Sequence, residues 1–224
     1  MIQSVKFDSS YMDIKKLANS LYIFTIKRLI EITGVFVSCI GILFFISLIS
    51  YSPNDPNFIF PENAEIKNII GFRGSYISDL FLQSVGLIVY FVPVTFIFTG
   101  IAMFRKKEIF LIVENIFYTI FYCLVGSLFF SYFYNNSFTL YINGNGGFVG
   151  NYLNQTFLNN FINSFENIIF YFLIILILTL FLISINFSPK NFYLSIKKIF
   201  LVVFKKDNKN YTNESEIINE YIPQ

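Results

Sequence analysis

Few side chains in this sequence are suited to chemistry. There is no His, and the two cysteines, Cys39 and Cys123, lie inside apolar runs. They can supply neither a zinc ligand set nor a disulfide framework, so we expect small buried thiols and no metal or cofactor. No Gly is followed by Lys, so the Gly-x-x-x-x-Gly-Lys-Ser/Thr loop that holds nucleotide phosphates is missing. We therefore expect no catalytic residue in this chain.

Glu114 is the acidic residue placed well inside an apolar stretch. Because isolating a charge in lipid is costly, such a residue is a candidate for a proton relay. Glu114 also lies less than two helical turns from the basic stretch 105–108, where its carboxylate can approach Arg105 or Lys107 or reach interfacial water. We expect the interfacial or paired role.

The Gly-rich stretch 143–150 superficially resembles a phosphate loop. It carries Gly144, Gly146, Gly147 and Gly150 but contains no Lys. Gly and Asn adopt a positive φ at little cost, so the composition is typical of a turn. We interpret this stretch as a turn in a loop.

The elements that position these residues are membrane spans. The sequence is 55% hydrophobic, has 31 Phe and 15 Tyr, and is only 13% charged, whereas soluble domains are about 25% charged. A helix needs roughly 20 apolar residues to cross a bilayer. Four stretches meet that length, at about 32–51, 80–104, 109–134 and 168–187. We predict an all-α membrane protein with four transmembrane helices.

The distribution of Lys and Arg predicts the orientation. All of the 16 basic residues except Lys67 and Arg73 lie before the first stretch, between the second and third, or after the fourth. Positive residues near spans stay in the cytoplasm. Both termini should therefore be cytoplasmic, with loops 52–79 and 135–167 in the opposite compartment.

The chain then divides into three parts. Residues 1–31 form a cytoplasmic N-terminal segment without the features of a cleaved signal peptide, and residues 32–187 form the transmembrane domain. In residues 188–224, apolar positions recur at helical spacing beside Lys197 and Lys198 and then give way to a polar tail. We predict a juxtamembrane amphipathic helix followed by the start of a polar linker.

Small residues and one proline predict how two spans behave. Gly34, Ser38 and Gly41 share a face of the first span, a spacing that lets helices approach closely, either within the chain or between copies. Pro93 removes a backbone donor from the second span and is expected to kink it.

The first long loop carries the most specific pattern. It opens with the run Ser50, Tyr51, Ser52, Pro53, Asn54, Asp55, Pro56 and continues with Asn68, Gly71, Gly74, Asp79, Gln83 and Gly86. The prolines end the first helix, and Asp79 suits a helix start. With the four Gly of the second loop, these residues resemble the N-terminal four-transmembrane domain of FtsK/SpoIIIE-type bacterial DNA translocases.

This resemblance implies a membrane anchor and oligomerisation domain in the bacterial inner membrane at the division septum, acting in cell division and chromosome segregation. The implied partners are the lipid bilayer, further copies of the chain, other septal membrane proteins, and DNA only through a motor domain that these residues do not contain. The loop motifs are the expected partner surface. The alternative is a small transporter or channel subunit, which needs convergent polar groups at mid-membrane depth. The residues leave open whether the chain is a fragment, a split product or a stand-alone protein.

Overall fold

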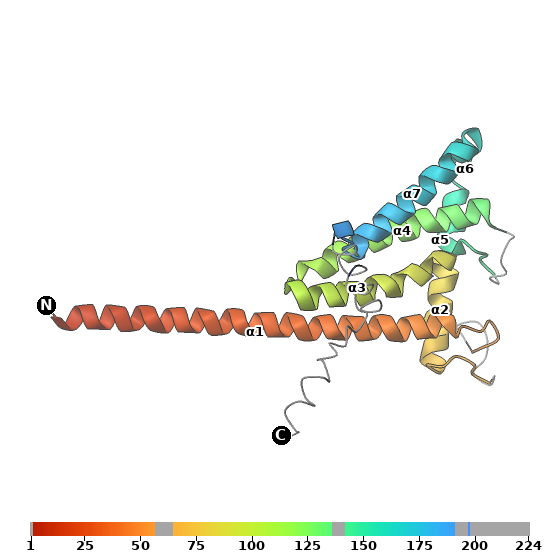
Figure 1. Cartoon of the computed structure of the whole chain (residues 1–224). Coiled ribbons are helices and arrows are strands. Elements are labelled where there is room, and N and C mark those ends of the chain that lie inside the picture. The colour runs from red at the N-terminus through yellow and green to blue at the C-terminus, as the bar shows by residue number, and fades with distance from the viewer. Residues whose placement is uncertain (1, 57–64, 136–141, 191–196, 198–224) are drawn as a thin grey trace, which may run out of the picture. The chain divides into compact units, whose positions relative to one another are not determined.

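The apolar stretches form helices, as their composition predicts. The computed structural model describes residues 2–56, 65–135, 142–190 and 197, with side chains from residue 14 onward. No strand occurs in this part of the chain. The elements are α1 Ile2–Ile49, α2 Phe72–Val85, the 3-10 helix η1 Gly86–Tyr90, α3 Phe91–Lys106, α4 Phe110–Phe133, α5 Gly147–Asn154, α6 Phe157–Ser164 and α7 Glu166–Ser184 (Figure 1).

Four helical segments are long and apolar enough to cross a membrane. They are Ile14–Ile49, Phe72–Lys106, Phe110–Phe133 and Glu166–Ser184. The predicted fold class, an all-α protein with four spans, is confirmed. The direction in which the spans cross stays a prediction from the basic residues.

The first helix is much longer than the expected span at 32–51. Its 48 residues correspond to about 72 Å at 1.5 Å per residue, whereas the hydrocarbon core is about 30 Å thick. Residues 14–29 are exposed at every position. Part of α1 must therefore extend beyond the hydrocarbon core as a continuation of the span.

The second span is interrupted by η1, between α2 and α3. Pro93 lies in the first turn of α3, where it cannot donate to the carbonyl of Val89, four residues earlier. That carbonyl belongs to η1. The expected kink therefore falls one turn before the proline, where a proline ring disrupts the preceding turn.

Short helices occupy parts of both long loops. α2 begins at Phe72, inside the expected loop 52–79, and α5 and α6 lie inside the expected loop 135–167. α6 begins with an N-cap, because Thr156 Oγ1 accepts from the N–H of Leu158. The predicted juxtamembrane helix and linker lie outside the described residues, apart from 188–190 and 197. The chain divides into units 1–186 and 187–224, and the first contains everything described below.

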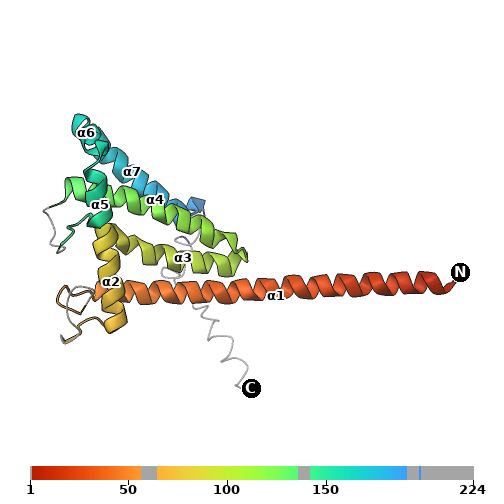
Figure 2. The same cartoon turned by 180° about the vertical axis from the view of Figure 1, so that it is seen from behind.

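α1 packs along α3 through small residues (Figures 1 and 2). A methyl group on Gly34 would lie 2.7 Å from the carbonyl oxygen of Gly100, and one on Gly41 would lie 2.9 Å from that of Pro93. Ser38 Oγ donates to the carbonyl of Ile97 at 3.1 Å. The small-residue face of α1 is thus used within the chain.

The apolar core lies where α3, α4 and α7 meet η1 and the last turns of α1. Tyr122, Leu48 and Val89 are fully buried there. Phe181 of α7 stacks on Phe91 of α3 with ring centroids 4.7 Å apart. α4 lies beside α7 in both views (Figures 1 and 2). This core holds the loop-bearing ends of the helices in place.

Candidate functional site: two motif loops joined by α2

Asp55 organises the first motif loop. Its carboxylate, 1% exposed, accepts from the backbone N–H of Lys67 at 3.0 Å and of Asn68 at 2.8 Å. Ser52 and Asp55 close a turn, since the Asp55 N–H donates to the Ser52 carbonyl at 3.1 Å. The charged acceptor ties the two ends of this loop together, and hydrogen bonds to charged groups are the stronger kind.

Asn68 connects the loop to the end of α1 and the start of α2. Its Nδ2 donates to the carbonyl of Ser47 at 2.8 Å, and its Oδ1 accepts from the N–H of Ile70 at 3.1 Å. A methyl group on Gly74 would overlap Asn68 Oδ1 and lie 2.5 Å from Ile70 Cβ. Ser47 Oγ donates to the Gly74 carbonyl at 2.6 Å. Glycine at position 74 therefore lets α2 reach the loop.

Prolines and serines complete the same contact region. Ser75 Oγ donates to the carbonyl of Pro56 at 2.8 Å, and Ser50 Oγ accepts from the N–H of Ile69 at 3.2 Å. Pro56 is buried and Pro53 is half-buried. The residues of the first motif are thus brought together, partly by bonds to one another and partly by bonds to neighbours such as Ser47, Ile69 and Ser75.

Tyr51 and Asp79 join the loop to the middle of α2. Tyr51 Oη donates to Asp79 Oδ1 at 2.9 Å, and Asp79 is buried. Burial, followed by the bond to the Asp79 carboxylate, raises the pKa of Tyr51 above its ordinary value, while the side chain of Gln83 lowers it in part. The phenol therefore stays protonated and keeps donating. Asp79 lies inside α2 and not at its start, which differs from the expected cap.

The second motif loop packs against Gly86. The N–H of Leu87 donates to the carbonyl of Asn145 at 2.9 Å, so the chain passes Gly86 at backbone contact distance. A methyl group on Gly86 would overlap the Asn145 carbonyl and lie 2.6 Å from the carbonyl carbon of Gly146. Asn145, fully buried, donates from Nδ2 to the carbonyl of Tyr134.

The other glycines of this loop also sit at close approaches. A methyl group on Gly147 would lie 2.5 Å from the N atom of Gly86, and one on Gly146 would lie 2.5 Å from Ser131 Cβ. One on Gly150 would lie 2.8 Å from the carbonyl carbon of Ser127. Gly144 and Gly147 adopt φ of +69° and +65°, and the Gly147 N–H donates to the Gly144 carbonyl. The stretch forms a turn that is packed against α2, η1 and α4.

We call residues 47–56, 67–86 and 143–151 together the motif cap. α2 contacts one loop through Gly74 and Asp79 and ends at Val85, and the next residue, Gly86, meets the other loop. The motif residues are mostly turned inward, whereas Ile69 and Phe148 are 75% and 63% exposed. Any surface offered to a partner is therefore made by exposed neighbours that the motif residues position.

A network of polar side chains lies inside the bundle, and the sequence pattern did not predict it. Thr95 Oγ1 is 3.1 Å from both Tyr122 Oη and Ser184 Oγ. Asn115 Nδ2 donates to Thr99 Oγ1 at 2.8 Å, and Asn186 Nδ2 donates to Asn115 Oδ1 at 3.0 Å. These bonds join α3 to α4 and to α7. In a membrane such bonds hold helices together.

Charged residues gather where the end of α3 that is far from the motif cap lies beside the middle of α1. Glu31, buried, pairs with Arg28 at 2.5 Å and with Lys107 at 2.8 Å. Glu114 is exposed, and in the described part of the chain no ion pair joins it to Arg105 or Lys107. Of the two roles expected for Glu114, the paired one is not seen among the described residues, where Lys107 is bound to Glu31, and the interfacial one stays a prediction.

The described residues offer no ready metal site. Among them no cluster of three or more His, Cys, Asp or Glu side chains could hold an ion. Cys123 is buried, as expected, whereas Cys39 is exposed on α1. α1 packs on one side only, so an apolar run did not predict burial for every residue in it.

Comparison with known proteins supports the sequence resemblance. A family model described as the 4TM region of DNA translocase FtsK/SpoIIIE matches residues 26–194, more than half of the chain. No curated protein and no solved structure matches the chain. The matched region contains all four candidate spans except the first residues of α1.

Proposed function

The chain belongs to the family of 4TM regions of FtsK/SpoIIIE DNA translocases, and on that premise we propose that it anchors a DNA translocase at the division septum. It is a multi-pass membrane domain, not the motor of such a translocase. The family match carries the proposal. In this function the chain would act in the inner membrane, in cell division and chromosome segregation, and DNA would be contacted only through a motor outside these residues.

The motif cap is the proposed surface for other septal membrane proteins. Its buried bonds hold the two loops against α2, while Ile69 and Phe148 are exposed there. We place the contact with a partner at these two apolar side chains. The basic residues predict that this cap faces away from the cytoplasm.

Septal localisation tests the proposal. We expect the chain fused to a fluorescent protein to concentrate at division sites, and Ile69→Lys or Phe148→Lys to reduce that concentration. Phe110→Lys is the matched control, because Phe110 is 81% exposed at the other end of the bundle. A uniform distribution of the unaltered chain around the membrane would contradict the septal role.

Oligomerisation is a separate part of the proposal. Because the small-residue face of α1 is occupied by α3, copies would meet through another surface. The opposite side of α1 exposes Val35, Phe36, Ile42 and Leu43. A chain that stays strictly monomeric at high density in nanodiscs would contradict this part alone.

Transport is the alternative class of function. It would need polar groups free to bind a substrate at mid-membrane depth. Thr95, Tyr122 and Ser184 instead bond to one another, which favours the anchor. A liposome flux assay separates the two, since an anchor should conduct nothing above background.

A further inference from the structure

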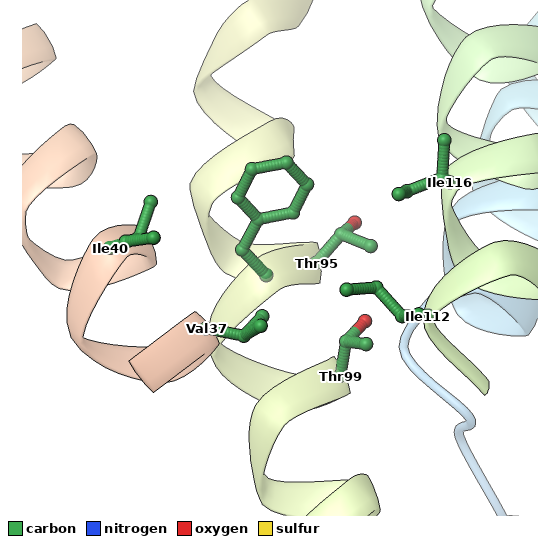
Figure 3. Close-up of a pocket in the computed structure, with 7 residues that line it drawn as sticks. Val37, Ile40, Thr95, Thr99, Ile112 and Ile116 are labelled. Carbon is green, nitrogen blue, oxygen red and sulfur yellow. The ribbon is translucent and has the colours of Figure 1, made fainter. Parts of the chain in front are cut away.

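A small apolar groove runs over α3 between α1 and α4. It has a volume of about 170 Å³. Val37 and Ile40 form one side and Ile112 and Ile116 the other, with Thr95 and Thr99 between them (Figure 3). This volume is well below the roughly 300 to 1,000 Å³ of sites for drug-sized ligands. It suits a segment of a hydrocarbon chain.

The groove is apolar although two threonines line it. The Thr95 hydroxyl is bonded to Tyr122 and Ser184, and the Thr99 hydroxyl accepts from Asn115. These bonds satisfy the polar atoms within the bundle. What remains for an occupant is hydrocarbon surface, so a polar ligand would gain no hydrogen bond there.

The groove lies at a defined depth below a cluster of charge. Val37 is six residues from Glu31 along α1, and Thr99 is eight residues from Lys107 along the chain. At 1.5 Å per residue these separations correspond to roughly 9 to 12 Å. If the charged residues mark the membrane interface, the groove lies within the hydrocarbon, whose half-thickness is about 15 Å.

The charged end carries an excess of positive groups. The cations among the described residues there are Lys27, Arg28, Arg105, Lys106 and Lys107, against the carboxylates of Glu31, Glu108 and Glu114. Glu31 is already bound by Arg28 and Lys107. Lys106 is exposed and donates to Asn186, whose side chain is neutral, so its charge is not offset by that bond. The arrangement leaves positive charge for an anion at the interface.

We propose that the groove and this cationic end form a site for one anionic glycerophospholipid of the bilayer. One acyl chain occupies the groove, and the phosphate headgroup lies over Lys107 and over Lys106, which follows Thr99 by two turns on the same face of α3. The spacing along α1 and α3 matches a headgroup at the interface with its chain beneath it. The site would place a specific lipid between α1 and α4, which face each other across the groove.

Charge favours lipid over a second copy of the chain. Two copies with the same orientation would bring identical cationic ends together, and like charges in proximity repel. An anionic headgroup instead neutralises that end, since each Lys or Arg near an anionic membrane surface contributes about 1 kcal/mol. The groove therefore suits a bilayer lipid better than a neighbouring protomer.

Lipid binding by the full chain, followed by native mass spectrometry, tests the proposal. We expect phosphatidylglycerol to bind at least about fivefold more tightly than phosphatidylcholine with the same acyl chains. Lys106→Gln should weaken phosphatidylglycerol binding about fivefold. It should weaken phosphatidylcholine binding less, because the choline ammonium already offsets the charge of the phosphate. Ile40→Phe, which fills the groove, should weaken both lipids. Ile101→Phe is the matched control, since Ile101 is exposed on α3 outside the groove.

Four results would overturn the proposal, three of them from the binding measurements. Equal affinity for the two lipids would show that the headgroup is not recognised. Equal binding by the Ile40→Phe and Ile101→Phe variants would show that the chain lies elsewhere. A lipid-free dimer that forms in place of the lipid complex would assign the groove to a second copy. Phosphatidylglycerol with a photoreactive acyl chain gives a test on the unaltered protein, and labelling confined to segments without residues 112–116 would also reject the site.

Discussion

Gly86 and Gly71 permit a test of how the motif cap is held together. The two glycines have nearly the same backbone angles, with φ 75° and ψ −154° at Gly86 and φ 79° and ψ −159° at Gly71. Alanine is strained in this region at either position. The surroundings differ, because a methyl group on Gly71 has nothing within 4 Å, whereas one on Gly86 overlaps the Asn145 carbonyl. Comparing the two variants therefore isolates the packing of the second loop.

The expected difference can be worked from these contacts. Backbone strain costs each alanine variant about 1 to 3 kcal/mol and cancels in the comparison. Gly86→Ala must also displace the second loop, which loses the Leu87 to Asn145 hydrogen bond, worth about 1 kcal/mol. Overpacking adds about 1 to 3 kcal/mol. We expect Gly86→Ala to lower the free energy of unfolding by about 2 to 4 kcal/mol more than Gly71→Ala.

Titration with sodium dodecyl sulfate in mixed micelles, followed by near-ultraviolet circular dichroism of the tyrosines, measures this difference. The sequence contains no Trp, so the tyrosines are the natural reporters of tertiary packing. Equal destabilisation of the two variants would refute the reasoning. It would mean that the second loop is not held against Gly86 in the membrane protein.

Three further predictions concern other bonds. Asp55→Ala should speed amide hydrogen exchange at residues 67–68 by about tenfold or more, because a hydrogen bond to a charged group is worth about 1.5 to 3 kcal/mol. Glu65→Ala, at an exposed position, is the control, and equal exchange rates in the two variants would contradict the bond. Because the pKa of Tyr51 is raised in the folded state, the protonated phenol contributes stability that is fully present below the unfolded-state pKa of about 10 and is lost as pH rises above it. The melting temperature of Tyr51→Phe should therefore fall less than that of the unaltered chain between about pH 8 and pH 11. Gly100→Ala would place a methyl group 2.7 Å from the Ser38 N atom and should destabilise α1 against α3 by about 1 to 3 kcal/mol; an unchanged detergent titration would argue against this packing.

The spans were predictable because their signal is local. An apolar run of about 20 residues has few alternatives to a helix in a bilayer, and each expected run contains or overlaps a helix. The extent of α1 was less accessible, since its polar first half has no apolar pattern to mark it. The break at Gly86–Tyr90 lies one turn before Pro93, because a proline disrupts the turn that precedes it and not its own position.

The contacts inside the site were predictable only in part. The family resemblance predicts that Asp55, Asn68 and Gly86 matter. It does not predict which other parts of the motif cap these residues bond to or pack against. Glu31 forms an ion pair with Lys107, 76 positions further along the chain, and Thr95 is hydrogen-bonded to Ser184, 89 positions further along. Such pairs depend on which helices pack side by side, and the spacing of residues within one helix does not predict that.

The position of α2 between two loops limits how the domain can be recombined. Gly86 accommodates the backbone of residues 145 and 146, while Gly74 accommodates Asn68. A loop taken from a relative would have to fit a helix that was shaped together with the other loop as well. Chimeras that exchange the first loop, α2 and the second loop together should fold more readily than those that exchange one loop alone. The motif cap should therefore be inherited as a unit, and substitutions in it should depend strongly on one another.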